Sequence, residues 1–543
     1  MYRPLIGFAG ILVANLVAAL DAASLSVALP TIASELQATS IQAYWAGTAF
    51  VLSSAACQPL FPAFSNAFGR RSVVIFALSL LILGSIVCGS AQGISALLAG
   101  RTIQGIGGGG ILAMTYTIMT DLFTLRRRSV AVAVNGMVWL LGAAVGPVMG
   151  GLLSTSALWR CIFWICLPLL VISLVLVSLF LGSKKDNSDQ PEEKHLPGAC
   201  KRIDWIGVAS LVASLTAFLV PVSWGGIMFP WQSWQTLVPL VIGLVGLASW
   251  VSYEHTFPSQ PMVPLSLFNN RTTSCALLGT FVIGIIQFGL VFYLPLYYQV
   301  VKGYSAVISG VALLPITLVS GLSTAITGMV IAKAGRYKIS VLTGWTVLAL
   351  GCGLLELLDL HTKTAEWIFI TAASGLGGGI LFTALTMAAQ AHVAQEHIAI
   401  AAALTPFVRA LGQAIGITAG NSIIQNGLKR NLQKSSFDRL RTNAGAVTRH
   451  MASPKFLLST FATSEDEVSA LLAAISNALK DFWWFLLAMA LLAGLLSLMI
   501  VDLNLEFTEK MDDAVVISTT SSRSDSSSEG GSIERKSAPS DQA

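Results

Sequence analysis

Charged residues are scarce in this chain. Asp, Glu, Lys and Arg make up 11% of its 543 residues, whereas soluble domains average about 25%. Hydrophobic residues make up 54%, and the mean hydropathy is +0.74. A soluble core of this length does not need so much apolar surface, so the composition excludes an ordinary soluble protein. The net charge of +5 comes mostly from basic residues beside apolar runs and indicates no nucleic-acid partner.

Cysteine is also sparse, and the chain has no pattern typical of a metal or nucleotide site. Its seven cysteines are scattered, with no CxxC or other metal-ligand spacing. The stretch Gly107–Gly110 lies inside an apolar run, without the lysine or the strand–turn–helix setting of a phosphate loop. We therefore expect no enzyme, no metal and no cofactor. Without an ATP-binding domain, a transport function would draw its energy from an ion gradient.

Long apolar runs dominate what is present. A helix that spans a bilayer needs roughly 20 mostly apolar residues, and fourteen separated runs meet this requirement. The first run has no small-residue cleavage site, so we expect a helix and not a signal peptide. The predicted fold class is an all-α polytopic membrane protein. The expected spans are Leu5–Pro30, Tyr44–Phe64, Ser72–Ala91, Leu97–Thr120, Val130–Leu153, Ile162–Leu181, Trp205–Pro221, Leu237–Tyr253, Ala276–Tyr298, Ser309–Ala332, Ile339–Leu358, Trp367–Ala389, Ala401–Ile424 and Phe482–Val501.

Polar stretches divide these runs into groups. A charged stretch after the sixth run predicts a cytoplasmic linker at 183–204, and the serine-rich end predicts a disordered cytoplasmic tail at 502–543. The expected domains are an N-terminal six-helix bundle at 1–182, two extra transmembrane helices at 205–253, a cytoplasmic loop at 254–275, and a C-terminal six-helix bundle at 276–501 with a long outer loop at 427–481.

Basic residues indicate the orientation in the membrane. With an even number of spans both termini share one side, and that side receives Arg70, Arg71, Arg126–Arg128 and Arg336. Cytoplasmic loops carry an excess of Lys and Arg, so we expect both termini in the cytoplasm. The predicted outer loop at 427–481 is an exception, because it carries several basic residues as well.

Two ionisable residues lie deep inside predicted spans. Asp21 and Arg101 each lie roughly 10–14 Å below the outer end of their span, at 1.5 Å per residue. Ionisable groups inside a bilayer are costly and usually face a partner or a cavity. We therefore predict an ion pair or a water-bridged contact, with Gln104 one turn beyond Arg101 and able to bond either partner. A proton on Asp21 would weaken this pair, which makes it a candidate coupling switch; the alternative is that it only fixes helix packing.

Glycines mark the fifth run. Gly142, Gly146, Gly150 and Gly151 leave one helix face without side chains, and Pro147 adds a kink. From these residues alone, a seam between packed helices is favoured over a role in substrate contact.

The second half supplies candidates for a substrate cavity. An apolar pocket with a few polar groups is typical of small-molecule sites. Arg409, in the middle of a predicted span and without a visible carboxylate partner, would either neutralise helix carbonyls or contact an anionic group. The remaining candidates are Trp45, Gln287, Phe288, Tyr293, Tyr297 and Gln390.

Several motifs resemble those of the major facilitator superfamily. The string Gly142–Gly151 matches the "GxxxGPxxGG" signature of its antiporters, and Arg101–Gly107 is similar to its "RxxQGxG" motif. The segment Leu20–Pro30 is similar to the family's first-helix motif, and Pro62–Arg71 resembles its "GxxxDxxGRR" loop.

In that last loop, the resemblance implies a cytoplasmic gate made by Asn66, Gly69, Arg70 and Arg71. Asn66 stands where the family has an aspartate, so a charge that helps to close the gate is missing.

The resemblance extends to the fungal fourteen-span drug:proton antiporter branch. It implies the major facilitator fold, with two six-helix bundles plus two inserted helices, and the loop at Gly328–Lys338 loosely repeats the Gly69–Arg71 loop. The implied function is a proton-coupled efflux antiporter in the plasma membrane that exports small amphipathic molecules, such as a fungal secondary metabolite, toxin or antifungal drug. The expected partners are this substrate, protons and the lipid bilayer, and the expected state is a monomer.

Two alternatives remain open at this point. A vacuolar transporter of basic amino acids occurs in the same branch, and Asp21 would then pair with a cationic substrate instead of Arg101. A non-transporting membrane sensor is a third interpretation, but such proteins normally carry a folded cytoplasmic domain.

Overall fold

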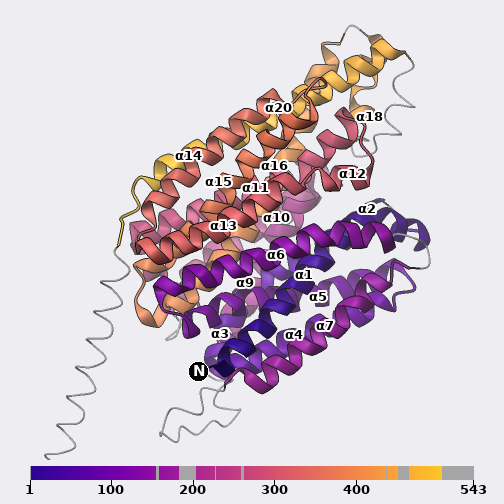
Figure 1. Cartoon of the computed structure of the whole chain (residues 1–543). Coiled ribbons are helices and arrows are strands. Elements are labelled where there is room, and N and C mark those ends of the chain that lie inside the picture. Colours follow the sequence, from indigo (N-terminus) through magenta and orange to yellow (C-terminus); the bar gives the residue numbers. More distant parts are fainter. Residues whose placement is uncertain are drawn as a thin grey trace, which may run out of the picture.

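The computed structural model describes residues 2–38, 40–153, 158–182, 204–226, 228–257, 262–435, 437–449 and 464–503. These residues are helical apart from turns and one isolated bridge between Gly225 and Phe229. Nearly all of the predicted linker and tail lies outside the described residues, so both stay predictions. Figure 1 shows two helical bundles side by side, the N-terminal one in indigo and purple, the C-terminal one in red to yellow.

The first bundle contains the first six predicted spans. Helix α5 packs between α2 and α4, and α1 packs against α6 and α7. The glycine-rich sequence of α5 allows this central position, because it has few side chains to keep neighbouring helices apart. The helices are α1 Tyr2–Glu35, α2 Ser40–Cys57, α3 Leu60–Phe68, α4 Arg70–Gly89, α5 Ile94–Leu122, α6 Leu125–Leu153 and α7 Cys161–Phe180.

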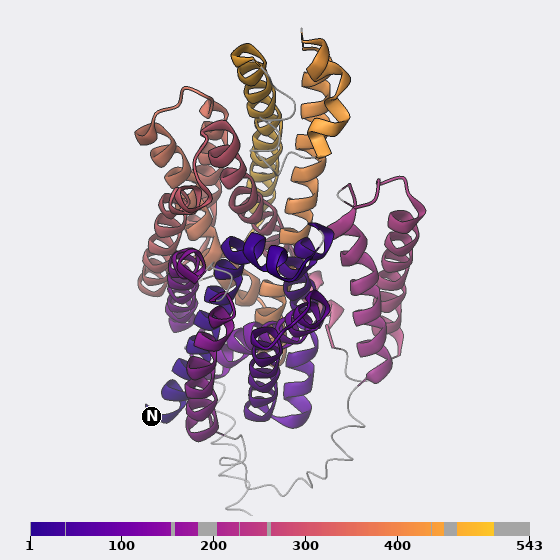
Figure 2. The same ribbon diagram turned by 90° about the vertical axis from the view of Figure 1, so that its right-hand side faces the viewer.

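The two extra helices form a hairpin of their own. Helices α9 (Trp205–Trp224) and α10 (Trp234–Thr256) pack on each other, and α9 also contacts α2 of the first bundle and α16 (Ile398–Gln433) of the second. Figure 2 shows the hairpin standing to one side of both bundles, in magenta at the right. The predicted inserted pair is therefore attached at the junction between the bundles.

The second bundle repeats the arrangement of the first. Helix α15 packs between α13 and α14, and α11 packs against α16. Its remaining elements, with short 3₁₀ and π segments labelled η, are η2 Leu265–Asn269, α11 Arg271–Leu296, η3 Tyr297–Val301, α12 Ala306–Val311, α13 Leu314–Ala334, α14 Lys338–Leu354, η4 Leu355–Leu357, α15 Thr364–Ala391, η5 Gln395–His397, α17 Asp438–Thr442, α18 Ala444–Arg449 and α20 Glu465–Ser497.

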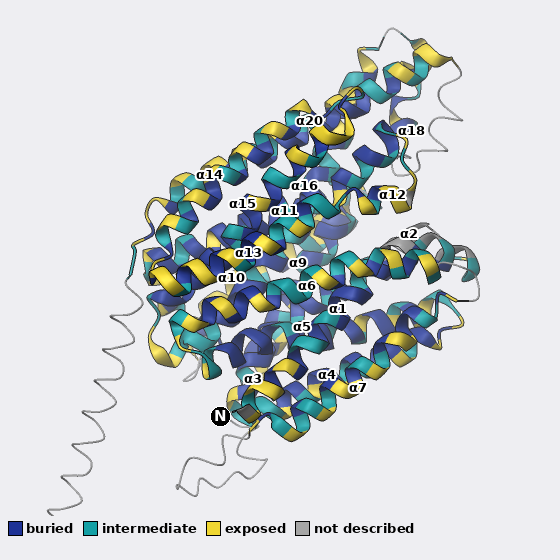
Figure 3. Cartoon of the chain, viewed as in Figure 1, coloured by how far each residue is buried: buried dark blue, intermediate teal, exposed yellow. Residues whose placement is uncertain are grey.

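Length and apolarity qualify twelve of the described helices to cross a membrane. The other two expected spans fall on α2, which is shorter, and on α5, whose glycines and Arg101 lower its hydropathy. The count of fourteen spans therefore stays a prediction. Large apolar side chains such as Leu152 and Phe369 are 75% exposed, and exposed residues lie along the outer faces in Figure 3. This is the surface expected for contact with lipid.

Two predicted boundaries are wrong. The second span was expected to be continuous to Phe64, but α2 ends at Cys57 and α3 begins at Leu60. The cause is Pro59, which has no N–H to continue the helical hydrogen bonds.

The predicted loop at 427–481 is also shorter than expected, because α16 continues to Gln433 and α20 already begins at Glu465. Ser464 and Glu467 form a capping box at the start of α20, and its first turn is acidic. Arg430 and Asp481 pair at 2.7 Å across the two extensions, which rise above the other helices in Figure 2. Hydropathy does not predict these additional helical turns of α16 and α20 because their residues are polar.

Candidate functional site

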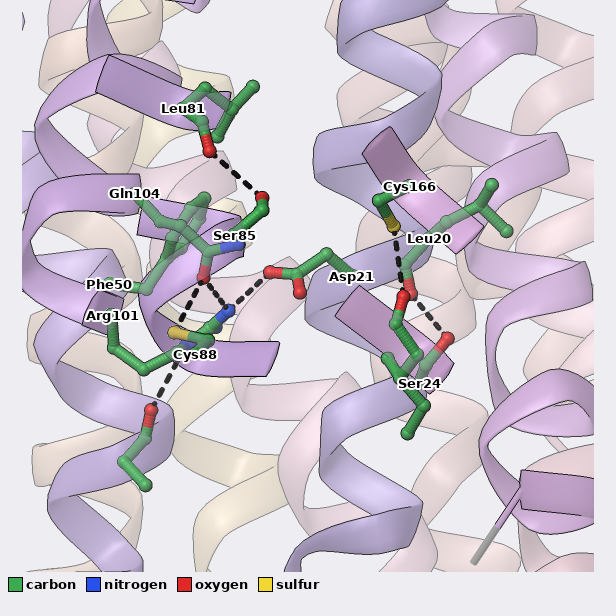
Figure 4. A network of polar contacts seen from close by, with 12 residues as sticks. Leu20, Asp21, Ser24, Phe50, Leu81, Ser85, Cys88, Arg101, Gln104 and Cys166 are labelled. Atoms are coloured by element: carbon green, nitrogen blue, oxygen red, sulfur yellow. Dashed lines mark hydrogen bonds and ion pairs between the residues drawn. The ribbon is translucent and has the colours of Figure 1, made fainter. Parts of the chain in front are cut away.

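Asp21 and Arg101 meet in the interior of the first bundle. Nη1 of Arg101 forms an ion pair with Oδ2 of Asp21, joining α5 to α1. Asp21 is 3% exposed and Arg101 is 1% exposed, so the pair is almost completely shielded from solvent. The contact predicted from depth alone is present in the structure, and Figure 4 shows its surroundings.

Arg101 has several other partners besides Asp21. Nη1 donates to Oε1 of Gln104 at 2.9 Å, and Nε donates to the carbonyl of Ala46 at 3.2 Å. The guanidinium also lies over the Phe50 ring, 4.8 Å from its centroid. These contacts would hold Arg101 in place even if Asp21 lost its charge.

Gln104 in turn donates from Nε2 to Ser85 at 2.8 Å. By contrast, Oδ1 of Asp21 is buried and has no hydrogen-bond partner among the described residues. Asp21 therefore carries a spare acceptor atom next to a fixed cation.

The glycines of the fifth span pack directly behind Asp21. A Cβ atom placed at Gly142, Gly146 or Gly150 would lie 2.3–2.5 Å from an atom of Ala19, Ala23 or Ser24 on α1. Only glycine permits this approach, so the predicted packing seam is present. The seam sets the position of α1, and with it the position of Asp21.

The proline of the same motif is accommodated inside α6. Pro147 does not end the helix, which runs on through Gly151 to Leu153. A Cβ at Gly310 in the second bundle would lie 3.7 Å from Cβ of Pro147. The motif therefore contacts α1 through its glycines and approaches the second bundle through its proline.

Glycines on α5 bring its neighbours equally close. A Cβ at Gly105 would lie 1.9 Å from Oγ of Ser53 on α2, and one at Gly107 would lie 2.6 Å from the Ala77 carbonyl on α4. The glycine-rich stretch thus serves helix packing around Arg101. The spacing of these glycines in the sequence is a signal for this packing role.

The predicted gate lies at the start of α4. Gly69 has φ +87°, which favours glycine, and Nη1 of Arg70 donates to Oδ1 of Asn66 at 2.8 Å. Nε of Arg70 pairs with Asp121 at the end of α5, at 2.9 Å. Asn66 therefore provides an oxygen that accepts a hydrogen bond, as the family's aspartate would, and Asp121 provides the negative charge that Asn66 lacks. Arg71 donates to the carbonyl of Ser178 on α7.

A second group of contacts joins the two bundles near this gate; we call it the latch. Nη1 of Arg128 donates to Oε1 of Gln390 at 2.7 Å, and Ser129 donates to the Gly328 carbonyl at 2.9 Å. Arg126 donates to the carbonyls of Ala332 and, at 3.1 Å, Lys333. From the sequence alone, these arginines indicated only the orientation in the membrane.

Gln390 was predicted as a polar group of the substrate cavity, but the structure places it in the latch. The reason is its position close to the end of α15, where the two bundles meet.

Most other predicted cavity residues have structural partners. Tyr293 is buried, donates to the Ile417 carbonyl at 2.5 Å and packs on Phe482 with ring centroids 4.9 Å apart. Tyr297 donates to the Asp359 carbonyl at 2.8 Å.

Trp45 donates to Sδ of Met228, beside the inserted hairpin, at 3.3 Å. Gln287 and Phe288 are only half-buried, so they remain the cavity candidates, together with the buried Arg409. Among the described residues, no group of His, Cys, Asp and Glu could hold a metal ion.

Comparison with known proteins decides the family. The model of the Major Facilitator Superfamily matches residues 11–417. This chain belongs to the Major Facilitator Superfamily. As a facilitator it is a multi-pass membrane protein that transports small molecules.

Curated relatives of this facilitator are fungal. It is 36% identical to "MFS transporter L2" of a Phoma species over 79% of this chain and 71% of the relative. It is 33% identical to "Efflux pump FUS6" of Gibberella fujikuroi over 92% of this chain and 89% of the relative. The fungal efflux branch indicated by the motifs is therefore supported along the chain.

Solved structures agree on the fold. The superposition on the human organic anion transporter MFSD10 covers 91% of this chain and 99% of that transporter, with a TM-score of 0.55 and 17% identity. The proton:xylose symporter XylE covers 91% and 94%, with TM-score 0.53 and 15% identity. At such identities the likeness concerns the arrangement of helices alone.

Proposed function

We propose that this facilitator exports small amphipathic organic molecules, such as a secondary metabolite, toxin or antifungal drug, in exchange for protons. The observation that carries the coupling is the buried Asp21–Arg101 pair with its spare Oδ1 atom. The names of fungal relatives, among them "Efflux pump FUS6" and "MFS-type efflux pump MMF1", support export.

The partners of Arg101 suggest how exchange works. A proton that reaches Asp21 from the outside neutralises it and weakens the ion pair, while Gln104 and the Ala46 carbonyl keep Arg101 in place. When the site opens to the cytoplasm, loss of the proton restores the pair. Helix α1 is thus bound to α5 more tightly in one protonation state than in the other, and this difference can drive a change of conformation.

The alternative of a basic amino-acid carrier has less support. Its cationic substrate would need the carboxylate of Asp21, and Arg101 already occupies one oxygen of that carboxylate. A cation would also have to approach a fixed guanidinium, which repels it.

The first test is accumulation of fungal metabolites and antifungal drugs in a pump-deleted yeast that expresses this chain, with and without a protonophore. We expect lower accumulation of some compounds, and we expect the protonophore to abolish the difference. An unchanged accumulation of every compound, combined with uptake of lysine or arginine into isolated vacuoles, would replace the proposal with the vacuolar carrier. The same cells show whether the chain reaches the plasma membrane as a monomer, which we also propose.

A further inference from the structure

Arg409 is a buried cation with few partners. It lies in the interior of α16 and is 7% exposed. Nη2 approaches Oγ1 of Thr386 at 3.5 Å, the outer limit of a hydrogen bond, and Nε has no partner among the described residues. The guanidinium lies 3.9 Å from the centroid of the Phe382 ring.

Arg101 provides the comparison inside the same chain. It is also buried, but it has a carboxylate, an amide oxygen and a backbone carbonyl as hydrogen-bond acceptors. Burying a charged group without such partners is costly. Among the described residues, the buried Arg101 of the first bundle has a counter-ion and the buried Arg409 of the second bundle does not.

No described carboxylate of the second bundle lies within ion-pair distance of Arg409. The acidic residues found in ion pairs there pair with other cations, as Glu356 does with Lys480 and Asp481 with Arg430. The interior of the second bundle therefore carries one positive charge that the described residues do not neutralise.

The donors of Arg409 also have a suitable geometry. Nε and Nη2 form one edge of the planar guanidinium, and two N–H groups on one edge match the two oxygens of a carboxylate. The Phe382 ring beneath these donors lies at the junction of the bundles. A Cβ atom added to Gly136 on α6, in the first bundle, would lie 3.8 Å from Cε1 of Phe382. This edge is buried in the present structure, so a ligand reaches it only when the bundles part during transport.

We propose that Arg409 binds a carboxylate of the exported molecule and that this facilitator prefers organic anions, with the apolar part of the substrate on Phe382. The inference rests on the proposed export function and names its substrate class. An anion removes the uncompensated charge, whereas a neutral or cationic molecule does not.

The test uses the purified full-length chain in proteoliposomes with a pH gradient, transporting a compound identified in the accumulation assay. The competitors are two matched pairs, 1-naphthylacetate with 1-naphthylacetamide and dodecanoate with dodecanamide. We expect each acid to compete about tenfold or more better than its amide, because a hydrogen bond between two charged groups is stronger than one between a charged and a neutral group. Equal competition within both pairs, or none by either acid up to millimolar concentration, overturns the proposal.

Variants assign the preference to one residue. Arg409→Gln is expected to reduce competition by the acids to the level of the amides, and Arg409→Lys to keep part of the preference because it keeps the charge. Lys429→Gln removes an exposed charge from the same helix and is expected to leave the preference unchanged. An undiminished preference for acids in Arg409→Gln, in protein that elutes as a single species, contradicts the role of Arg409.

The outcomes separate this inference from the export proposal. If no compound is exported, or if export ignores the proton gradient, the proposed function fails. If export is proton-driven but is inhibited equally by acids and amides, only the anion preference fails.

Discussion

Asp21 and Arg409 place charge inside the molecule in opposite ways. Asp21 pairs with Arg101, which Gln104 also contacts, so Arg101 would keep a hydrogen-bond partner if Asp21 lost its charge. Arg409 always carries its charge and has no described counter-ion. In the proposed function, Asp21 exchanges a proton and Arg409 attracts an anion from outside the chain.

Asp21→Asn keeps the size of the side chain but cannot take up a proton. We expect export to lose its response to an imposed pH gradient, with a rate close to that of vesicles without protein. The measurement is efflux from proteoliposomes at several pH gradients. Lys429→Gln, which removes an exposed charge from α16, serves as a control and should retain the response. A normal pH response in Asp21→Asn would remove Asp21 from the coupling step.

Replacing each buried arginine by methionine should affect stability in opposite directions. Arg101→Met leaves Asp21 without its counter-ion, and breaking a buried pair in this way costs about 3–5 kcal/mol. Arg409→Met removes an uncompensated charge and is expected to be neutral or stabilising. Thermal unfolding of both variants in detergent measures the difference. A comparable loss of stability in both variants would indicate that Arg409 has a structural partner.

Between helices, close contacts through glycine determine where the ionisable groups lie. Gly146→Ala would place a methyl group 2.5 Å from Cβ of Ala23, and overpacking of this kind costs about 1–3 kcal/mol. We expect a lower unfolding temperature together with reduced export, because α1 carries Asp21. Gly47→Ala on α2 is the matched control, since nothing lies within 4 Å of its added Cβ.

Glu35 joins the C-terminal end of α1 to the start of α7. Its carboxylate pairs with Arg160 at 2.6 Å and accepts from Nε1 of Trp159 at 2.8 Å. The hydrogen bond from Arg160 is the largest influence on the pKa of Glu35, which is lowered from its ordinary value of 4.5. A lowered pKa means that the stabilising contribution is present above about pH 4.5 and is lost as the pH falls through the folded-state value.

Glu35→Gln should therefore unfold at a lower temperature than the parent chain at pH 7. The difference between the two unfolding temperatures, the gap, should narrow as the pH falls below about 4.5. Unfolding temperatures from pH 7 to pH 3.5 measure this effect. A gap that stays constant over the whole range would show that the charge of Glu35 is unimportant.

Across the whole molecule, the apolar runs predicted the helices well because bilayer thickness imposes a simple rule of length. The rule failed where hydropathy does not report helix formation. Pro59 interrupts a helix inside an apolar run, and α16 and α20 continue as helices through polar sequence. Spacing also predicted the Asp21–Arg101 contact, because both residues had a computable depth.

The contacts between the bundles could not be predicted in this way. Gln390 was expected in the cavity, and its partner Arg128 lies far away in sequence. A single sequence does not show which helix ends come together after two bundles dock. Asp121, which supplies the charge missing at Asn66, was also overlooked, because its partner Arg70 lies 51 residues away in the sequence of the first bundle.

The latch offers a prediction about the joined bundles. Arg128→Met and Gln390→Leu should each lower the unfolding temperature. The double variant should lose less stability than the sum of the two single variants, because both substitutions remove the same contact. A coupling of about 0.5–3 kcal/mol is typical of residues in contact. A double-mutant cycle from denaturation in detergent measures it, and strict additivity would contradict the hydrogen bond.

The extensions of α16 and α20 bear on how this transporter can be studied. At 57.3 kDa, a chain embedded in a detergent micelle gives electron-microscopic particles few landmarks for alignment. The paired extensions, held by Arg430 and Asp481, present an ordered epitope for an antibody fragment. Binding of that fragment to intact cells, without permeabilisation, would also reveal which face of the membrane the extensions occupy.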